Sequence, residues 1–86
     1  MLHILKTHPQ PFDDVFRGIK TFEFRLDDRN YQVGDILVLR KYDPDNSEFF
    51  FHEDRSYVEE YVRVNHIIRG PAYGIPEGYA CMSISK

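Results

Sequence analysis

Short segments with strand character, separated by turn residues, are the feature that most constrains the fold of this sequence. Residues 21–26 read Thr-Phe-Glu-Phe-Arg-Leu, and this alternation of apolar and polar residues has the period of two typical of a β-strand. Residues 36–39 form a continuous apolar run, as in a buried strand. The other strand candidates are residues 1–5, 57–68 and 79–84. Glycine and proline are concentrated between the last two, which predicts a turn there.

One helix interrupts this series near the N-terminus. Residues 11–17 place Phe12 and Val15 at helical spacing, and Gly18 follows as a helix stop. Residues 43–54 predict a loop that folds into a hairpin. We therefore expect a mostly β (α+β) fold, a small β-barrel of five to six strands with one short helix, formed as a single domain by all 86 residues. Closure of the barrel would leave no exposed strand edges.

The composition predicts a soluble cytoplasmic protein without metal or cofactor. Cys81 is the single cysteine, which excludes an internal disulfide and a cysteine-rich zinc site and favours a reducing compartment. The four histidines have no metal-ligand spacing. No run approaches the roughly 20 apolar residues of a membrane span, and no signal segment is visible.

Charge is distributed unevenly along the chain. Residues 43–60 carry seven acidic and one basic side chain and net −6, whereas the rest carries ten basic and seven acidic side chains and nets +3. This distribution permits a local site for an anionic ligand, although the total of −3 argues against a broad electrostatic grip on duplex nucleic acid. The acidic segment is either a solvated loop or a docking surface for a protein partner.

The segment directly after the predicted helix contains the polar and charged side chains that are the best candidates for a binding site. Lys20 stands at the helix–strand junction, and the next strand places Thr21, Glu23 and Arg25 at two-residue spacing over about 13 Å. Lysine and arginine suit phosphate contacts, whereas threonine and glutamate can bind polar edges of a base or sugar. Arg29 follows shortly after. A plain solvent-exposed strand with an ion pair between these residues explains the same pattern and stays open.

This segment resembles the signature of the ASCH family, named for activating signal cointegrator homology. The pattern is Gly-x-Lys-Thr-x-Glu-x-Arg over residues 18–25. Three further features match in the same order: the helical residues 12–17, the run Val-Gly-Asp-Ile-Leu-Val-Leu at 33–39, and the closing Gly-Tyr-x-x-Met-x-Ile at 78–84. Together they extend over nearly the whole chain.

The resemblance implies a PUA-like β-barrel with a cleft, beside the strand of residues 20–25, that binds RNA or a nucleotide. Carried over by position, the binding residues are Lys20, Thr21, Glu23, Arg25 and Arg29. On this hypothesis Lys20→Ala and Arg25→Ala abolish binding and leave the melting temperature within a few degrees of the wild-type value.

Some members of that family are enzymes, which leaves a hydrolase alternative open. In the amidohydrolases that act on acetylated cytidine, a nucleophilic threonine lies three positions after the lysine, and here that position holds Glu23. A carboxylate cannot replace the hydroxyl nucleophile unaided. The candidate catalytic residues are therefore Lys20, Thr21 and Glu23, with Lys20 and Glu23 as an acid–base pair of a ribonuclease or amidohydrolase.

Overall fold

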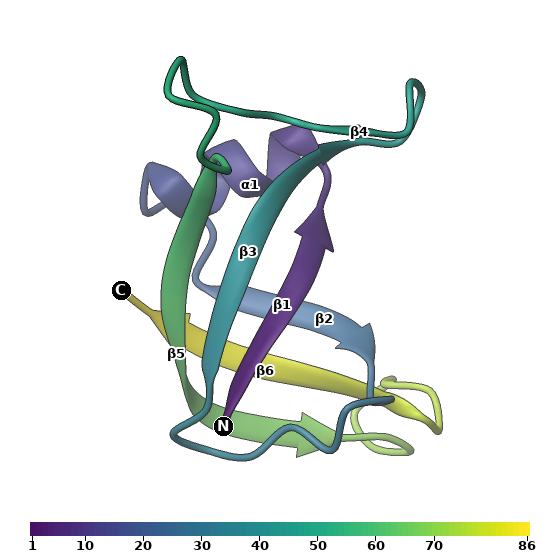
Figure 1. Ribbon diagram of the computed structural model, residues 1–86. Helices are drawn as coiled ribbons and strands as arrows, with labels where there is room; N and C mark the ends of the chain where they lie inside the picture. The colour runs from purple at the N-terminus through teal and green to yellow at the C-terminus, as the bar shows by residue number, and fades with distance from the viewer.

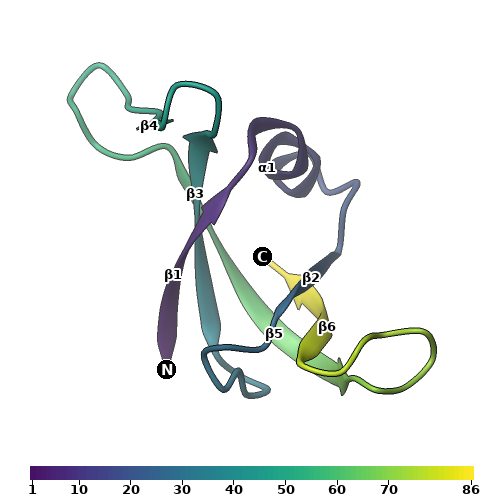
Figure 2. The same ribbon diagram turned by 90° about the vertical axis from the view of Figure 1, so that its right-hand side faces the viewer.

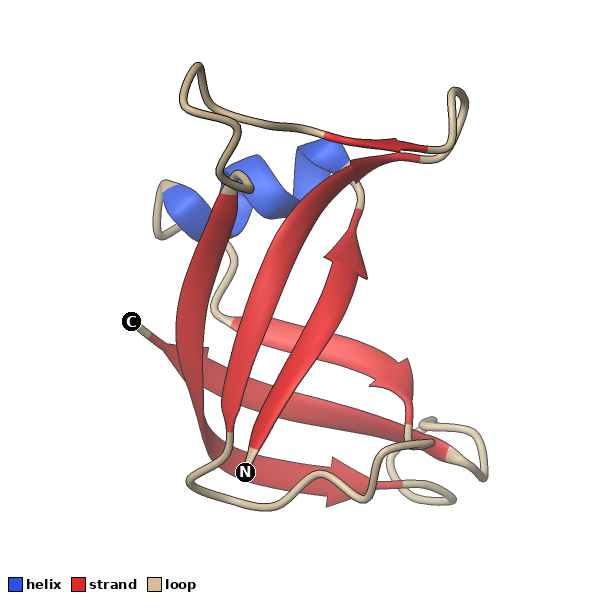
Figure 3. Ribbon diagram, in the orientation of Figure 1, coloured by secondary structure: helices blue, strands red, loops and turns tan.

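The computed structural model describes residues 1–86 and consists of six strands and one helix (Figure 1 and Figure 3). The strands are β1 (Leu2–Thr7), β2 (Phe22–Leu26), β3 (Ile36–Asp43), β4 (Glu48–Phe49), β5 (Glu59–Arg69) and β6 (Tyr79–Ser85). The helix α1 (Pro9–Phe16) has eight residues, and no helix of the chain has the length and apolar character needed to cross a membrane. The prediction of a small, mostly β fold with one N-terminal helix is confirmed.

All strands belong to one sheet with the order β1-β3-β5-β6-β2, to which β4 adds a hairpin with β3. The pair β1–β3 is parallel, and the other pairs are antiparallel. In Figure 1, β1, β3 and the first part of β5 run side by side, and β2, β6 and the end of β5 cross beneath them. The view turned by 90° shows the same two halves with α1 at one end (Figure 2).

The long strand β5 joins the two halves because it contains a bulge. Its register with β6 shifts between Val64 and His66. Such a bulge bends a strand and lets it pass from one part of a sheet to another. It also breaks the alternation of side chains: Val64 is fully buried, whereas His66 is exposed, although strict alternation from Val62 would place both on the buried side.

The hydrophobic core lies between the two halves of the sheet and α1. Its members come from all the long strands except β2, together with the helix and the turn before β3: Leu5, Phe12, Val15, Tyr31, Leu37, Leu39, Val62, Val64, Met82 and Ile84. The helix ends as the sequence predicts. Gly18 has a φ of +77° and donates its N–H to the carbonyl of Val15, which turns the chain toward β2.

The barrel is not closed by backbone hydrogen bonds, so the expectation of closure is wrong. β1 and β2 are the two ends of the strand order and do not pair. We call the gap between them the seam. Arg25 Nη2 donates to the carbonyl of Lys6 at 3.0 Å and to Thr7 Oγ1 at 3.1 Å, and Arg29 Nη1 donates to the carbonyl of Ile4 at 3.1 Å. Guanidinium groups thus satisfy edge carbonyls of β1 that a neighbouring strand would otherwise bind.

Candidate functional site

Two adjoining clefts lie along the seam, with volumes of about 220 Å³ and about 550 Å³. Lys6, Phe24 and Arg25 line both clefts. Lys20 and Glu23 line the smaller cleft, beside the junction of β1 and α1. The structure therefore brings the lysine, the glutamate and the first arginine of the predicted site into one concave region, together with residues from β1.

Glu23 forms the centre of this site. Its side chain is 3% exposed, and its Oε1 and Oε2 accept hydrogen bonds from Lys20 Nζ and Arg25 Nε, each at 2.7 Å. Such charge-assisted hydrogen bonds hold the two cations in fixed positions. Each carboxylate oxygen already accepts one hydrogen bond from a cation. The arrangement makes Glu23 a residue that positions Lys20 and Arg25.

The orientation of β2 is the reverse of the usual one for a strand over a core. Glu23 is 2% exposed, whereas the apolar Phe22, Phe24 and Leu26 are each about half exposed. The alternation that the sequence predicts is present, but its polar side faces inward. A buried carboxylate with two cationic partners is tolerated there because its charge is compensated.

The second cleft contains Arg29 and Tyr31, from the segment after β2. Burial raises the pKa of the Tyr31 phenol, with contributions of opposite sign from nearby Arg25 and Asp28. Tyr31 therefore remains a neutral hydroxyl at physiological pH. Arg29 uses one Nη for the carbonyl of Ile4, which leaves most of its five N–H donors for another acceptor.

The seam is positively charged although the chain as a whole is negative. Its two clefts are lined by four basic and two acidic residues, but the ammonium of Lys6 lies 4.7 Å from the centroid of the Tyr42 ring on β3. Three cations therefore face two carboxylates at the seam, in a protein of net charge −3. The basic residues are Lys6, Lys20, Arg25 and Arg29, and the acidic residues are Glu23 and Asp28. The arrangement can hold an anionic ligand at this one place on the surface.

Thr21 does not join the other predicted site residues. It lies before the first residue of β2 and lines a separate cleft of about 310 Å³ between the end of α1, the first part of β5 and the end of β6. Its carbonyl accepts the N–H of Ile84 at 3.0 Å. Lys20 borders this cleft as well as the seam. Thr21 therefore lines a different cleft from Glu23 and Arg25.

Several residues of the seam escape prediction from the sequence. Lys6 and Thr7 at the end of β1 and His8 after it line the smaller cleft. The order lysine, threonine, histidine, proline matches no motif that would indicate a binding site. The parallel pairing of β1 with β3 places the end of β1 across the seam from β2, where Arg25 reaches Thr7, 18 residues away along the chain.

The acidic segment projects away from the seam as an arm around β4 (Figure 2). Two of its carboxylates close local turns: a hydrogen bond from Asn46 holds the pKa of Asp43 below its usual value, and one from Ser56 does the same for Asp54. These acids stabilise the arm itself. They contribute nothing to the seam.

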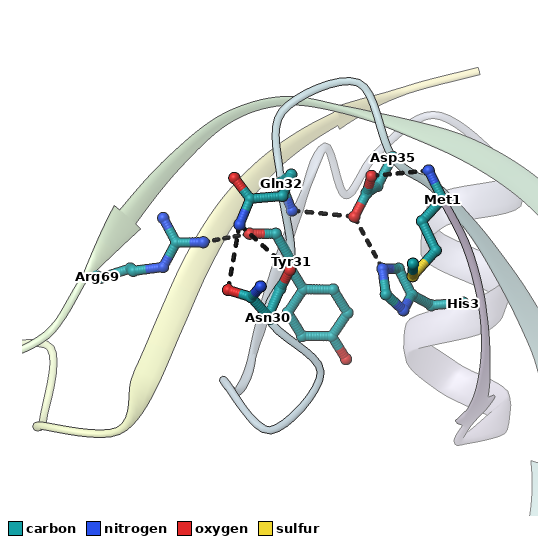
Figure 4. A network of polar contacts seen from close by, with 7 residues as sticks. All are labelled: Met1, His3, Asn30, Tyr31, Gln32, Asp35 and Arg69. Atoms are coloured by element: carbon teal, nitrogen blue, oxygen red, sulfur yellow. Dashed lines mark hydrogen bonds and ion pairs between the residues drawn. The ribbon is translucent and has the colours of Figure 1, made fainter.

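A polar network at the other end of β1 fixes the turn that leads into β3 (Figure 4). Asp35 is 5% exposed and accepts hydrogen bonds from the amino group of Met1 at 3.0 Å and the backbone N–H of Gln32 at 3.0 Å. Its Oδ2 also contacts His3 Nε2 at 2.8 Å. The His3 ring packs edge-on against Tyr31, with centroids 4.9 Å apart. The network thus positions a residue of the larger cleft.

This network predicts a loss of stability in acid. Burial alone would raise the pKa of Asp35, but the hydrogen bonds from His3, the Met1 amino group and Gln32 outweigh it and lower the pKa to about 2. As the pH falls below about 4, the unfolded chain binds the proton first, so the stabilisation is complete above pH 4 and is lost by about pH 2. We expect Asp35 to contribute about 2 kcal/mol of this loss.

Urea unfolding at pH 5, 4, 3 and 2.5 measures this effect, with Asp35→Asn as the control. The wild type should lose stability more steeply than the variant over this range. Equal pH dependence in the two proteins would show that Asp35 does not carry the effect.

Two comparisons with known proteins bear on the chain. A stretch of 41 residues is 46% identical to the "uncharacterized 12.9 kDa protein in GpA 3'region" of Escherichia phage P2 and covers 48% of this chain. The match spans 38% of the length of that phage protein. The profile of the family described as "domain of unknown function (DUF3850)" matches residues 2–84, which is nearly the entire chain. The protein therefore belongs to the DUF3850 family.

Proposed function

We propose that the seam binds RNA or a nucleotide through its phosphate groups. The observation that carries this proposal is the convergence of Lys20, Arg25 and Arg29 on two adjoining clefts in a protein of net negative charge. Arginine offers planar pairs of donors that match phosphate oxygens, and lysine adds a point charge.

The guanidinium groups of Arg25 and Arg29 retain N–H donors that no protein acceptor binds. Arg25 uses its Nε for Glu23 and its Nη2 for Lys6 and Thr7, so that both donors of Nη1 remain. Arg29 has a single acceptor, the carbonyl of Ile4. Residues 18–25 resemble the signature of the ASCH family. Because the resemblance implies a cleft beside this strand that binds RNA or a nucleotide, it supports the same ligand.

Removal of one seam cation is expected to weaken binding without unfolding the protein. Lys20→Ala and Arg29→Ala should each raise the Kd for an RNA oligonucleotide by about tenfold and reduce the salt dependence of binding by roughly one ion. Fluorescence anisotropy titrations between 50 and 300 mM salt measure both quantities. Arg63→Ala is the matched control, since Arg63 is an exposed arginine of β5 that lines neither cleft. If Lys20→Ala and Arg29→Ala bind like the wild type, the seam is not the site.

The same preparations test the hydrolase alternative. The contact of Lys20 Nζ with Glu23 Oε1 at 2.7 Å places a proton donor beside a proton acceptor within a cleft. Incubation with acetylated cytidine and with a set of RNAs, followed by chromatography, detects turnover. Product that is absent with Glu23→Gln, in a variant that still binds the RNA with the wild-type Kd, would assign catalysis to this pair.

A further inference from the structure

The outer side of β2 and β6 carries a row of exposed apolar side chains next to the seam. In the antiparallel register, Phe24 lies opposite Cys81 and Leu26 lies opposite Tyr79, so these side chains share one side of the sheet. Phe22 is 48%, Phe24 46%, Leu26 51% and Tyr79 36% exposed. We call Phe22, Phe24, Leu26 and Tyr79 the aromatic face. An apolar row of this kind on the outside of a small domain indicates a contact surface.

The aromatic face and the seam are continuous. Phe24 lines both clefts of the seam, and Leu26 and Tyr79 line the larger one. The rings of Phe24 and Tyr79 are stacked, with centroids 5.5 Å apart and an interplanar angle of 19°. Lys20 Nζ, which belongs to the seam, lies 5.2 Å from the centroid of the Phe22 ring. Cations and exposed rings therefore follow β2 side by side.

We propose that the ligand is a single-stranded nucleic acid whose phosphates occupy the seam and whose unpaired bases stack on Phe24 and Tyr79. This inference rests on the proposed function of the seam and names its substrate class. A base in a duplex is already stacked between its neighbours, whereas an unpaired base offers its full ring to an aromatic side chain. The cations of the seam, next to the aromatic face, favour a nucleic acid over an apolar protein partner. An apolar partner would not pair with these cations, whereas the phosphates of a nucleic acid bind them and its bases stack on the rings.

Four variants and three labelled 12-nucleotide probes test this inference. The probes are oligouridine RNA, oligodeoxyuridine DNA and an RNA duplex of equal length. Loss of base stacking at one ring is expected to raise the Kd for a single strand by about 5- to 150-fold in Phe24→Leu and in Tyr79→Leu. Phe24→Tyr retains the ring and should bind like the wild type. Tyr61→Leu is the matched control, because Tyr61 is 55% exposed on β5 and lines neither cleft of the seam. The duplex should bind more weakly than either single strand. Tighter binding of RNA than of DNA would show that the 2′-hydroxyl is recognised.

The outcomes separate this inference from the function on which it rests. If duplex and single strands bind equally and Phe24→Leu has no effect while Arg29→Ala weakens binding, the stacking surface is refuted and the seam stands. If the wild type binds none of the probes, both proposals fail. If sedimentation shows a dimer that Phe24→Leu converts to a monomer, a second copy covers the aromatic face and the inference is overturned.

Discussion

Replacing Glu23 by alanine is expected to lower the free energy of unfolding by about 2–4 kcal/mol. The Glu23 side chain is 3% exposed, and removal of its carboxylate leaves Lys20 Nζ and Arg25 Nε, on side chains that are 20% and 24% exposed, without their anionic partner. Loss of one partner of a buried pair costs more than the pair itself contributes, because a desolvated charge remains. Partial access of the two cations to water moderates the cost. For a chain of this size the melting temperature should fall by roughly 10–25 °C.

Urea unfolding measures this change against a matched pair elsewhere in the protein. Arg40 Nε contacts Glu59 at 2.8 Å with the same geometry, but the Glu59 side chain is 22% exposed. Glu59→Ala should therefore cost under about 1 kcal/mol. If Glu23→Ala and Glu59→Ala lose equal stability, burial of Glu23 does not organise the seam. The contacts of Arg25 with Glu23, Lys6 and Thr7 also lead us to expect a lower melting temperature for Arg25→Ala, in place of the nearly unchanged value that the sequence predicts.

Replacing Gly70 by alanine is the second change expected to have a large effect. A Cβ at this position would lie 1.8 Å from the backbone oxygen of Pro76 and 2.6 Å from that of Ile75. Both contacts are with backbone, so the loop between β5 and β6 must move to make room. Gly70 also donates its N–H to the carbonyl of Tyr79 at 2.9 Å, which ties the loop to the start of β6. We expect a loss of about 3 kcal/mol or more.

Differential scanning calorimetry checks this effect, and Gly74→Ala in the same loop serves as the control. Gly74 has a φ of +80°, and no atom lies within 4 Å of the place that an alanine methyl group would take, so alanine there costs only backbone strain of about 1 kcal/mol. A melting temperature for Gly70→Ala at or above that of Gly74→Ala would contradict the steric argument. A folded Gly70→Ala protein should also bind oligonucleotides more weakly, because Tyr79 belongs to the aromatic face.

The elements of the fold follow from local patterns in the sequence. Period-two alternation predicts β2, the apolar run predicts β3, and helical spacing followed by Gly18 predicts α1. These predictions succeed because backbone geometry alone sets the period of side chains along a strand or a helix. Their boundaries differ by a few residues, as at α1, which begins at Pro9 and not at residue 11.

The candidate site can be predicted from such local patterns only in part. The alternation of β2 is visible, but it does not indicate that Glu23 is buried and that Phe24 is exposed. The side of a strand that faces the interior depends on which distant segments pack beside it, and here the polar side of β2 meets β1 across the seam. The bulge after Val64 and the separation of Thr21 from the seam likewise leave no local signal.

The sequence by itself determined the class of fold, the position of the helix and the segment that carries Lys20, Glu23 and Arg25. The tertiary structure decided that β1 lies across the seam from β2, that Arg25 and Arg29 bind its edge carbonyls, and that exposed rings border these cations. The reason is physical: periodicity arises from neighbouring residues, whereas the seam is made by segments that pair with other strands and meet only because their sheet curves.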